Sequence, residues 1–215
     1  MSYSRVSKLS LVVIIDYDAG NLRSVQRACN EVGIAAEISA DADRVREAER
    51  VIFPGVGAAG AAMRSLQKNG LDEALHEVLA DGKPVLGICL GLQISFDRSE
   101  ENDQETLGLL PGCVKRFEFQ RRDLKIPHMG WNEVRVIRPH PMLAGIEPGD
   151  EFYFVHAFYP SPALADNVFA VTDYESEFAS AVGKDNYFAT QFHPEKSGRV
   201  GLRLLEQFAC WDGTC

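Results

Sequence analysis

The chain is acidic and has the composition of an ordinary globular protein. Its 215 residues include 22 lysines and arginines against 31 aspartates and glutamates, a net charge of −9 at pH 7. This charge argues against a general nucleic-acid binder, which needs a basic surface to neutralise phosphates. The longest apolar run, residues 9–15, is too short to cross a bilayer. Five widely spaced cysteines fit neither a disulfide framework nor a zinc site, so we expect a soluble, cytoplasmic protein.

The first half of the chain alternates between strand-like and helix-like segments. Residues 1–10 are polar and lack periodicity, which predicts a flexible N-terminal extension before a single domain over residues 11–215. Short β-branched runs predict buried strands, and apolar residues at helical spacing predict helices. The predicted strands are 11–15, 34–38, 51–53 and 84–88, and the predicted helices are 22–32, 41–49, 61–68, 71–80 and a segment after Cys89.

The second half has a different texture. Short alternating runs over residues 113–191, separated by proline, glycine, asparagine and aspartate, predict antiparallel or mixed strands. Residues 202–211 predict a closing helix. Together these patterns predict an α/β fold: a single doubly wound domain with a mainly parallel central sheet, flanking helices and an additional antiparallel or mixed sheet region in the C-terminal half.

A candidate nucleophile lies where a predicted strand meets a helix. The segment Gly87-Ile88-Cys89-Leu90-Gly91 has the layout of a nucleophile elbow, with cysteine in place of serine. Glycines on both sides permit a sharp turn that lifts the sulfur above the end of the strand. The start of the following helix favours the thiolate, the nucleophilic form. An isolated cysteine is most often a small core residue, but the flanking glycines argue against that reading.

Two further segments supply the groups that such a nucleophile needs. His193 and Glu195 follow an alternating strand, and residues two apart on an extended segment point the same way. Glu195 would then orient His193, which would exchange protons with Cys89 and the leaving amine. The turn Pro54-Gly55-Val56-Gly57 could offer backbone N–H groups to an oxyanion. It is not a phosphate-binding loop, because no Gly-Lys-Ser/Thr follows.

These motifs resemble those of the class I (triad) glutamine amidotransferases. Within that family the chain is similar to the glutaminase subunits of imidazole glycerol phosphate synthase over roughly residues 11–208. The segments that carry the resemblance are 16–17, 20–25, 54–58, 87–93, 127–132, 153–156 and 193–195.

The resemblance implies a role for each matching residue. Cys89 would attack the side-chain amide of glutamine, with His193 as general base and acid and Glu195 as its orienting partner. The strand 54–57 would form the oxyanion hole, with Val56 as donor between Gly55 and Gly57, and Gln93 would help to bind glutamine. No metal or organic cofactor is implied.

The resemblance also implies a partner. Ammonia would pass to a HisF-type (β/α)₈-barrel cyclase in a heterodimer. The cyclase would convert the nucleotide PRFAR to imidazole glycerol phosphate and AICAR in histidine biosynthesis. Five residues in matching motifs would lie at the interface: Met129, Trp131, Asn132, Tyr153 and Lys196. Trp131 and Tyr153 could equally be core aromatics, although both residue types are enriched at interface hot spots.

Some readings stay open at this stage. A paralogous subunit could feed ammonia to another synthase, such as one that aminates a sugar in surface-polysaccharide assembly. A partner-independent cysteine hydrolase and an inactive binding module are further alternatives. The sequence departs from the family at Asp18 and Thr190, where glycine is usual, and at Ala157-Phe158. We expect His76 and His140 at the surface and Cys29, Cys113 and Cys210 in the core.

Overall fold

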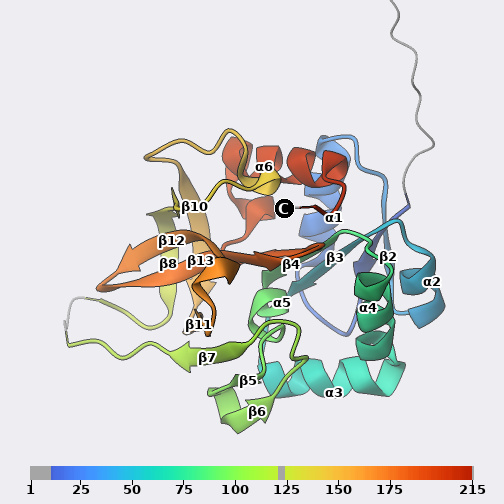
Figure 1. The fold of residues 1–215 in the computed structure, drawn as a ribbon, viewed down its shortest axis with the longest axis horizontal. Coiled ribbons are helices and arrows are strands. Elements are labelled where there is room, and N and C mark those ends of the chain that lie inside the picture. The colour runs from blue at the N-terminus through green and yellow to red at the C-terminus, as the bar shows by residue number, and fades with distance from the viewer. Residues whose placement is uncertain (1–10, 121–123, 215) are drawn as a thin grey trace, which may run out of the picture.

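The computed structural model describes residues 11–120 and 124–214, so the extension expected over residues 1–10 lies outside the described residues. Eight strands form the central sheet, in the order β2–β1–β3–β4–β14–β13–β12–β9 (Figure 1). They are β1 (Val12–Ile15), β2 (Ala36–Ser39), β3 (Arg50–Gly55), β4 (Val85–Cys89), β9 (Arg135–Val136), β12 (Val168–Tyr174), β13 (Ser176–Lys184) and β14 (Tyr187–Thr190). From β2 to β14 neighbouring strands are parallel, and from β14 to β9 they are antiparallel. The predicted α/β class is confirmed.

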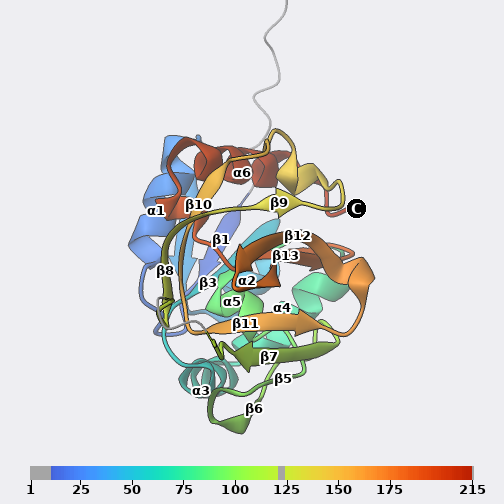
Figure 2. The ribbon, with the colours of Figure 1, turned by 90° about the vertical axis from the view of Figure 1, so that its left-hand side faces the viewer.

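Helices cover both faces of this sheet because its central strands are apolar on both sides. Val12 and Ile14 of β1 belong to the core under α1 and α6, whereas Val13 and Ile15 belong to the core under α2, α3 and α4. Successive side chains of a strand point to opposite faces, so a continuous apolar run requires two cores. The helices are α1 (Leu22–Glu31), α2 (Ala42–Glu47), α3 (Ala59–Asn69), α4 (Leu71–Ala80) and α6 (Gly198–Cys210), and α1 and α6 lie side by side (Figure 2).

Two smaller sheets are built largely from residues 113–191, where the alternating pattern predicts strands, but two short strands within residues 98–105 were not predicted. One pairs β8 (His128–Glu133) with β10 (Glu151–His156), at the end of the molecule away from α2 and α4 (Figure 1). The other has the order β11–β7–β5–β6. Its strands are β5 (Arg98–Ser99), β6 (Gln104–Glu105), β7 (Gly112–Arg116) and β11 (Phe158–Pro162). Four 3₁₀ turns connect these elements: η1 (Glu101–Asp103), η2 (Pro141–Leu143), η3 (Ala165–Asn167) and η4 (Pro194–Lys196).

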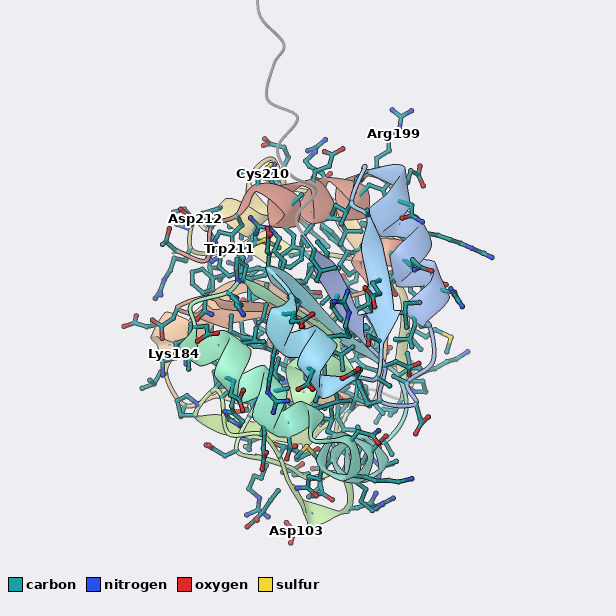
Figure 3. All side chains as sticks on the ribbon, turned by 90° about the vertical axis from the view of Figure 1, so that its right-hand side faces the viewer. Asp103, Lys184, Arg199, Cys210, Trp211 and Asp212 are labelled. Carbon is teal, nitrogen blue, oxygen red and sulfur yellow. The ribbon has the colours of Figure 1, made fainter. Side chains whose placement is uncertain are left out.

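Several details differ from the sequence-based expectations. The helix after Cys89, α5, is a single turn over Leu90–Gln93, and the closing helix begins at Gly198. His140 is only 5% exposed, because its ring stacks on Phe188 at 4.5 Å between centroids. Among the predicted core cysteines, Cys29 is buried, Cys113 is half-buried and Cys210 is exposed at the end of α6 (Figure 3). No helix in the described part of the chain has the length and apolarity that crossing a membrane requires.

The contact between α6 and η4 depends on a glycine. A Cβ atom on Gly201 would overlap the backbone carbonyl of Pro194, which is the first residue of η4. Backbone on both sides leaves little freedom to relax, so Gly201 sets the distance between α6 and this turn.

We predict that Gly201→Ala lowers the free energy of unfolding by about 1–3 kcal/mol, because the added methyl overpacks this contact. Gly60→Ala is the matched control. It also lies within a helix, but its Cβ would meet the ends of two flexible side chains, Gln104 at 3.0 Å and Arg64 at 3.4 Å. A flexible side chain can move, and alanine favours the helix by about 1 kcal/mol, so Gly60→Ala should be neutral or stabilising. Chemical denaturation compares the two variants, and equal destabilisation would contradict the prediction.

Candidate active site

Cys89 ends β4 in a strained conformation. Its φ is 54° and its ψ is −102°, a region that non-glycine residues seldom adopt. Close packing accounts for the flanking glycines: a Cβ on Gly87 would overlap the Tyr187 hydroxyl, and one on Gly91 would overlap the Phe53 carbonyl. The elbow geometry expected from the sequence is therefore present, and it places the sulfur at the carboxyl end of the sheet.

His193 and Glu195 form a buried pair beside this elbow. His193 Nδ1 lies 2.7 Å from Glu195 Oε1, and their side chains are 1% and 0% exposed. The expectation that an extended segment aligns these two side chains is wrong. Instead the 3₁₀ turn η4 folds Glu195 back onto His193.

The surroundings of His193 favour its charged form. Burial opposes protonation, but the neighbouring Cys89 and Glu195 outweigh it and raise the pKa of His193 to about 10. Its Nδ1 donates to Glu195, and its Nε2 makes no hydrogen bond to a nitrogen or oxygen atom of any described residue. This arrangement pairs an imidazolium with a nearby sulfur nucleophile and leaves one N–H to protonate a leaving group.

Two residues that the sequence reasoning did not assign complete this cluster. Asn21 donates to Glu195 Oε1 at 2.5 Å, and Gln191 Nε2 donates to Cys89 Sγ at 3.7 Å. Asn21 precedes α1 at the N-cap position, but its side chain does not cap the helix. Asn21 lies in the segment 20–25 that carries the family resemblance, but no local pattern indicated that its side chain binds Glu195. Gln191 had no local signal either.

The strand end at Gly55 lies beside the nucleophile. Gly55 is the register partner of Cys89 in the parallel pair of β3 and β4. The next two residues, Val56 and Gly57, line a cavity of about 340 Å³ together with Cys89 and Gln93. Parallel neighbours bring their carboxyl ends to one edge, so this loop is placed where an oxyanion would form.

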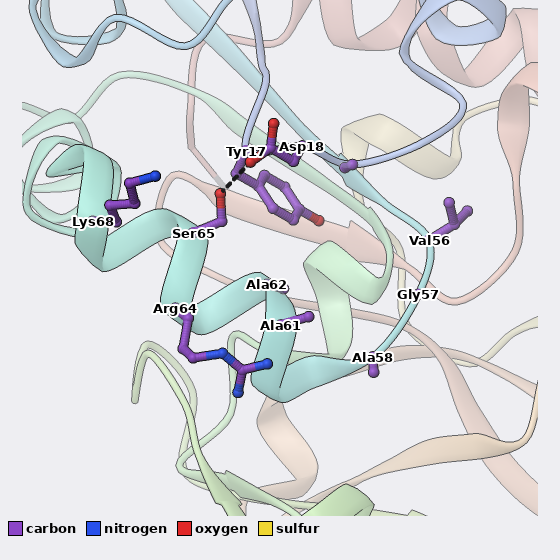
Figure 4. A pocket seen from close by; sticks show the side chains of 11 residues that line it. Tyr17, Asp18, Val56, Gly57, Ala58, Ala61, Ala62, Arg64, Ser65 and Lys68 are labelled. Atoms are coloured by element: carbon purple, nitrogen blue, oxygen red, sulfur yellow. Dashed lines mark hydrogen bonds between the residues drawn. The ribbon is translucent and has the colours of Figure 1, made fainter.

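A second cavity, of about 470 Å³, is also lined by Val56 and Gly57 (Figure 4). The loop therefore borders two cavities. Asp18, where the family usually has glycine, lines this second cavity with a φ of 63° and accepts a hydrogen bond from Ser65 at 3.1 Å. Aspartate thus keeps the left-handed backbone that a glycine would adopt, and a side-chain hydrogen bond supports it.

Gln93 lines the first cavity, and hydrogen bonds hold its side-chain amide in place. Its Nε2 donates to the Phe158 carbonyl at 2.8 Å and to Gln191 Oε1 at 3.1 Å. Phe158 therefore contributes a backbone group, which makes the departure at Ala157-Phe158 tolerable. Thr190, the third departure, is buried and its hydroxyl donates to the Phe192 carbonyl.

The residues predicted at a partner interface lie on and beside the small β8–β10 sheet. Met129 is 62% exposed and Trp131 is 53% exposed, so Trp131 is not a core aromatic. Tyr153 is half-buried, packs edge-on against Trp131 and lies under the Lys196 ammonium at 5.7 Å. Asn132 differs from the others: it faces inward, where its amide contacts His128 and the carbonyl of Asp173.

We predict that His193 is charged at neutral pH, whereas three other histidines are neutral. Because the pKa of His193 is raised to about 10, His193 should bind its second proton throughout pH 6–9 and lose it as the pH rises through about 10. Burial lowers the pKa of His128 and of His140 to about 4 and that of His156 to about 3, so these rings should be neutral. Ring ¹⁵N chemical shifts at pH 7.5 measure both states. A neutral His193 would contradict the assignment.

Comparison with known proteins identifies the family. The class-I glutamine amidotransferase pattern matches residues 13–210. The chain is 50% identical to the imidazole glycerol phosphate synthase subunit HisH of Desulfovibrio desulfuricans, over 92% of this chain and 93% of that protein. It is 47% identical to HisH of Nitrosococcus oceani, over 95% of this chain and 99% of the relative.

Solved structures agree on the fold. The chain aligns with PurLQS from Thermotoga maritima at a TM-score of 0.72 and 19% identity, covering 94% of this chain and 98% of that one. A crystal structure of a glutamine amidotransferase aligns at a TM-score of 0.69 and 20% identity, covering 93% and 99%. The chain therefore belongs to the class-I glutamine amidotransferases and, within them, to the HisH family, the glutaminase subunits of imidazole glycerol phosphate synthase in histidine biosynthesis.

Proposed function

We propose that Cys89, His193 and Glu195 form the triad that hydrolyses glutamine. The Cys89 thiolate attacks the δ-carbonyl carbon of glutamine, and the carbonyl oxygen takes the negative charge. His193 donates its Nε2 proton to the amide nitrogen, the C–N bond breaks, and ammonia leaves behind a glutamyl thioester. The single observation that carries this proposal is the buried His193–Glu195 pair, charged beside a cysteine at an elbow.

The second half of the cycle reverses the proton transfer. His193, now neutral, takes a proton from water as the water oxygen attacks the thioester carbon. Release of glutamate regenerates the thiolate and the imidazolium. Glu195 accepts from His193 Nδ1 and stabilises the charged ring. A thiolate nucleophile requires a reducing compartment, and for this reason we place the protein in the cytoplasm.

The remaining predicted residues bind the substrate. We assign the oxyanion hole to the Val56 N–H, with Gly55 and Gly57 supplying the backbone freedom on either side. Gln93 helps to hold the glutamine that enters the cavity it lines. Two cavities border the Val56–Gly57 peptide, and this space would permit it to rotate, so that the hole can be formed or withdrawn.

Ammonia is passed to a second subunit. The HisH relationship supports a heterodimer with a HisF-type (β/α)₈-barrel cyclase that converts PRFAR to imidazole glycerol phosphate and AICAR. Free ammonia becomes ammonium in neutral water and loses its nucleophilic lone pair, so an enclosed path is needed. Exposed Met129 and Trp131, with Tyr153 and Lys196 beside them, form the surface that we assign to this partner, and Asn132 supports it from the inner face.

Cys89→Ala should reduce glutamine-dependent synthesis roughly 10⁴-fold or more, because it removes the nucleophile. Synthesis from added ammonium salts should survive in the same complex with the cyclase. Cys210→Ala, which changes an exposed cysteine at the end of α6, is the matched control and should retain both activities. Equal loss of both activities in Cys89→Ala would contradict the proposal that Cys89 serves glutamine hydrolysis alone.

The isolated chain should be a poor glutaminase that its partner switches on. We expect a HisF-type cyclase loaded with its nucleotide to stimulate glutamine hydrolysis about 5- to 150-fold, the usual range of coupling between two sites. Rotation of the Val56 peptide is the change we expect to underlie it. Steady-state assays with and without the loaded cyclase measure the effect. Full activity of the free chain would refute the switch, and an absence of stimulation would indicate another synthase as partner.

A further inference from the structure

Two buried histidines outside the triad join the inner face of β8 to the wall of the glutamine cavity. His128 Nδ1 lies 3.0 Å from His156 Nε2, and both residues are at most 5% exposed. They are directly opposite each other at one end of the β8–β10 sheet. His156 itself lines the cavity that contains Cys89.

The neighbours of this pair determine where each proton lies. His156 Nδ1 is 2.8 Å from the Phe158 carbonyl, which can only accept, so His156 carries its proton on Nδ1. Its Nε2 is then an acceptor, and His128 must donate to it from Nδ1. Both histidines are therefore neutral Nδ1–H tautomers, since a second proton on either ring would set two donors against each other.

The outer end of the chain gives the same assignment independently. Asn132 Oδ1 accepts from the Glu133 N–H at 2.8 Å, which fixes the orientation of the amide. The amide nitrogen, a donor only, then faces His128 Nε2 at 3.3 Å and the Asp173 carbonyl at 2.9 Å. His128 Nε2 must accept, so its proton is again on Nδ1. Two ends of one chain thus require the same pair of tautomers.

The inner end of the chain continues to the nucleophile. The Phe158 carbonyl accepts from His156 and also from Gln93 Nε2 at 2.8 Å. With two donors its lone pairs are occupied and its position is determined. Gln93 also donates to Gln191, which donates to Cys89 Sγ. Hydrogen bonds thus connect His156 through Phe158, Gln93 and Gln191 to the sulfur.

We propose that His128 and His156 are positioning residues for glutamine hydrolysis, which hold the Phe158 carbonyl and transmit the position of β8 to the glutamine site. This inference rests on the proposed function of that site. Packing alone does not explain the pair, because phenylalanine would fill the same space among Phe117, Phe154 and Phe178. Phenylalanine could not donate to a carbonyl that faces the reaction cavity.

The kinetic test compares two replacements of His156 in the complex with a HisF-type cyclase. His156→Phe preserves an aromatic ring but removes both hydrogen bonds, and it should raise the KM for glutamine about tenfold, with kcat changed less than about threefold. In His156→Asn, the side-chain nitrogen takes the place of Nδ1 and can donate to Phe158. It should restore most of the lost affinity for glutamine.

His140→Phe is the matched control. His140 is also buried and stacked on aromatic rings, but it packs against Phe188, away from the chain of hydrogen bonds. Its KM for glutamine should stay within about twofold of the unmodified protein. An equal rise of KM in His140→Phe and His156→Phe would overturn the proposal, as would His156→Asn behaving like His156→Phe while both remain folded by circular dichroism.

A second readout does not depend on activity. Ring ¹⁵N shifts at pH 7.5 should show His128 and His156 each as a single Nδ1–H tautomer. Asn132→Ala removes the donor to His128 Nε2, but the Phe158 carbonyl still requires a proton on Nδ1 of both rings, so both should keep this tautomer, with a smaller rise of KM. An Nε2–H tautomer of either ring in the unmodified protein would overturn the proposal. If the unmodified complex hydrolyses no glutamine, the proposed function fails. The tautomers of His128 and His156 still decide whether this chain of hydrogen bonds exists.

Discussion

The candidate active site is organised around one buried histidine, His193, whose pKa its neighbours raise. A charge that is 1% exposed must be paired and hydrogen-bonded, since its desolvation would otherwise favour the neutral ring. Its partners come from separate parts of the chain: Cys89 ends β4, and Glu195 lies on the turn after β14. These two strands are parallel neighbours, so their carboxyl ends meet at one edge of the sheet. The strand order therefore brings Cys89 to the His193–Glu195 pair.

The loop before α1 contacts both the His193–Glu195 pair and the loop that follows β3. Tyr17 donates its hydroxyl to the Pro54 carbonyl at 2.7 Å, which holds the strand that leads into the oxyanion loop. Gly20 packs so closely under Val56 that a Cβ would come within 2.9 Å of its methyl group. Asn21 binds Glu195. Because these contacts lie within five residues, a displacement of this loop would disturb the triad and the oxyanion loop together.

The sequence predicts the features that depend on neighbouring residues and misses those that depend on distant ones. The strand and helix periodicities and the glycine-flanked elbow are local patterns, and they indicated the fold, which is confirmed, and the candidate nucleophile, which stays a prediction. The 3₁₀ turn at Glu195 was missed because alternation alone cannot distinguish an extended end from a tight turn. Asn21 and Gln191 act on groups far away in the sequence. His140 is buried by rings from other elements, although its flanking prolines indicated a surface loop.

The two faces of the β8–β10 sheet carry different residues: one carries the surface that we propose for the partner, and the other faces the proposed glutamine site. Its outer face presents Met129 and Trp131, while its inner face carries the His128–His156 pair. The backbone of the same sheet also holds the triad, since the Tyr153 carbonyl accepts from the His193 N–H at 2.9 Å. In a two-stranded sheet the outer and inner side chains share one backbone, so they cannot move separately. If the partner binds this outer face, as we propose, it would act on the proposed glutamine site without reaching into it.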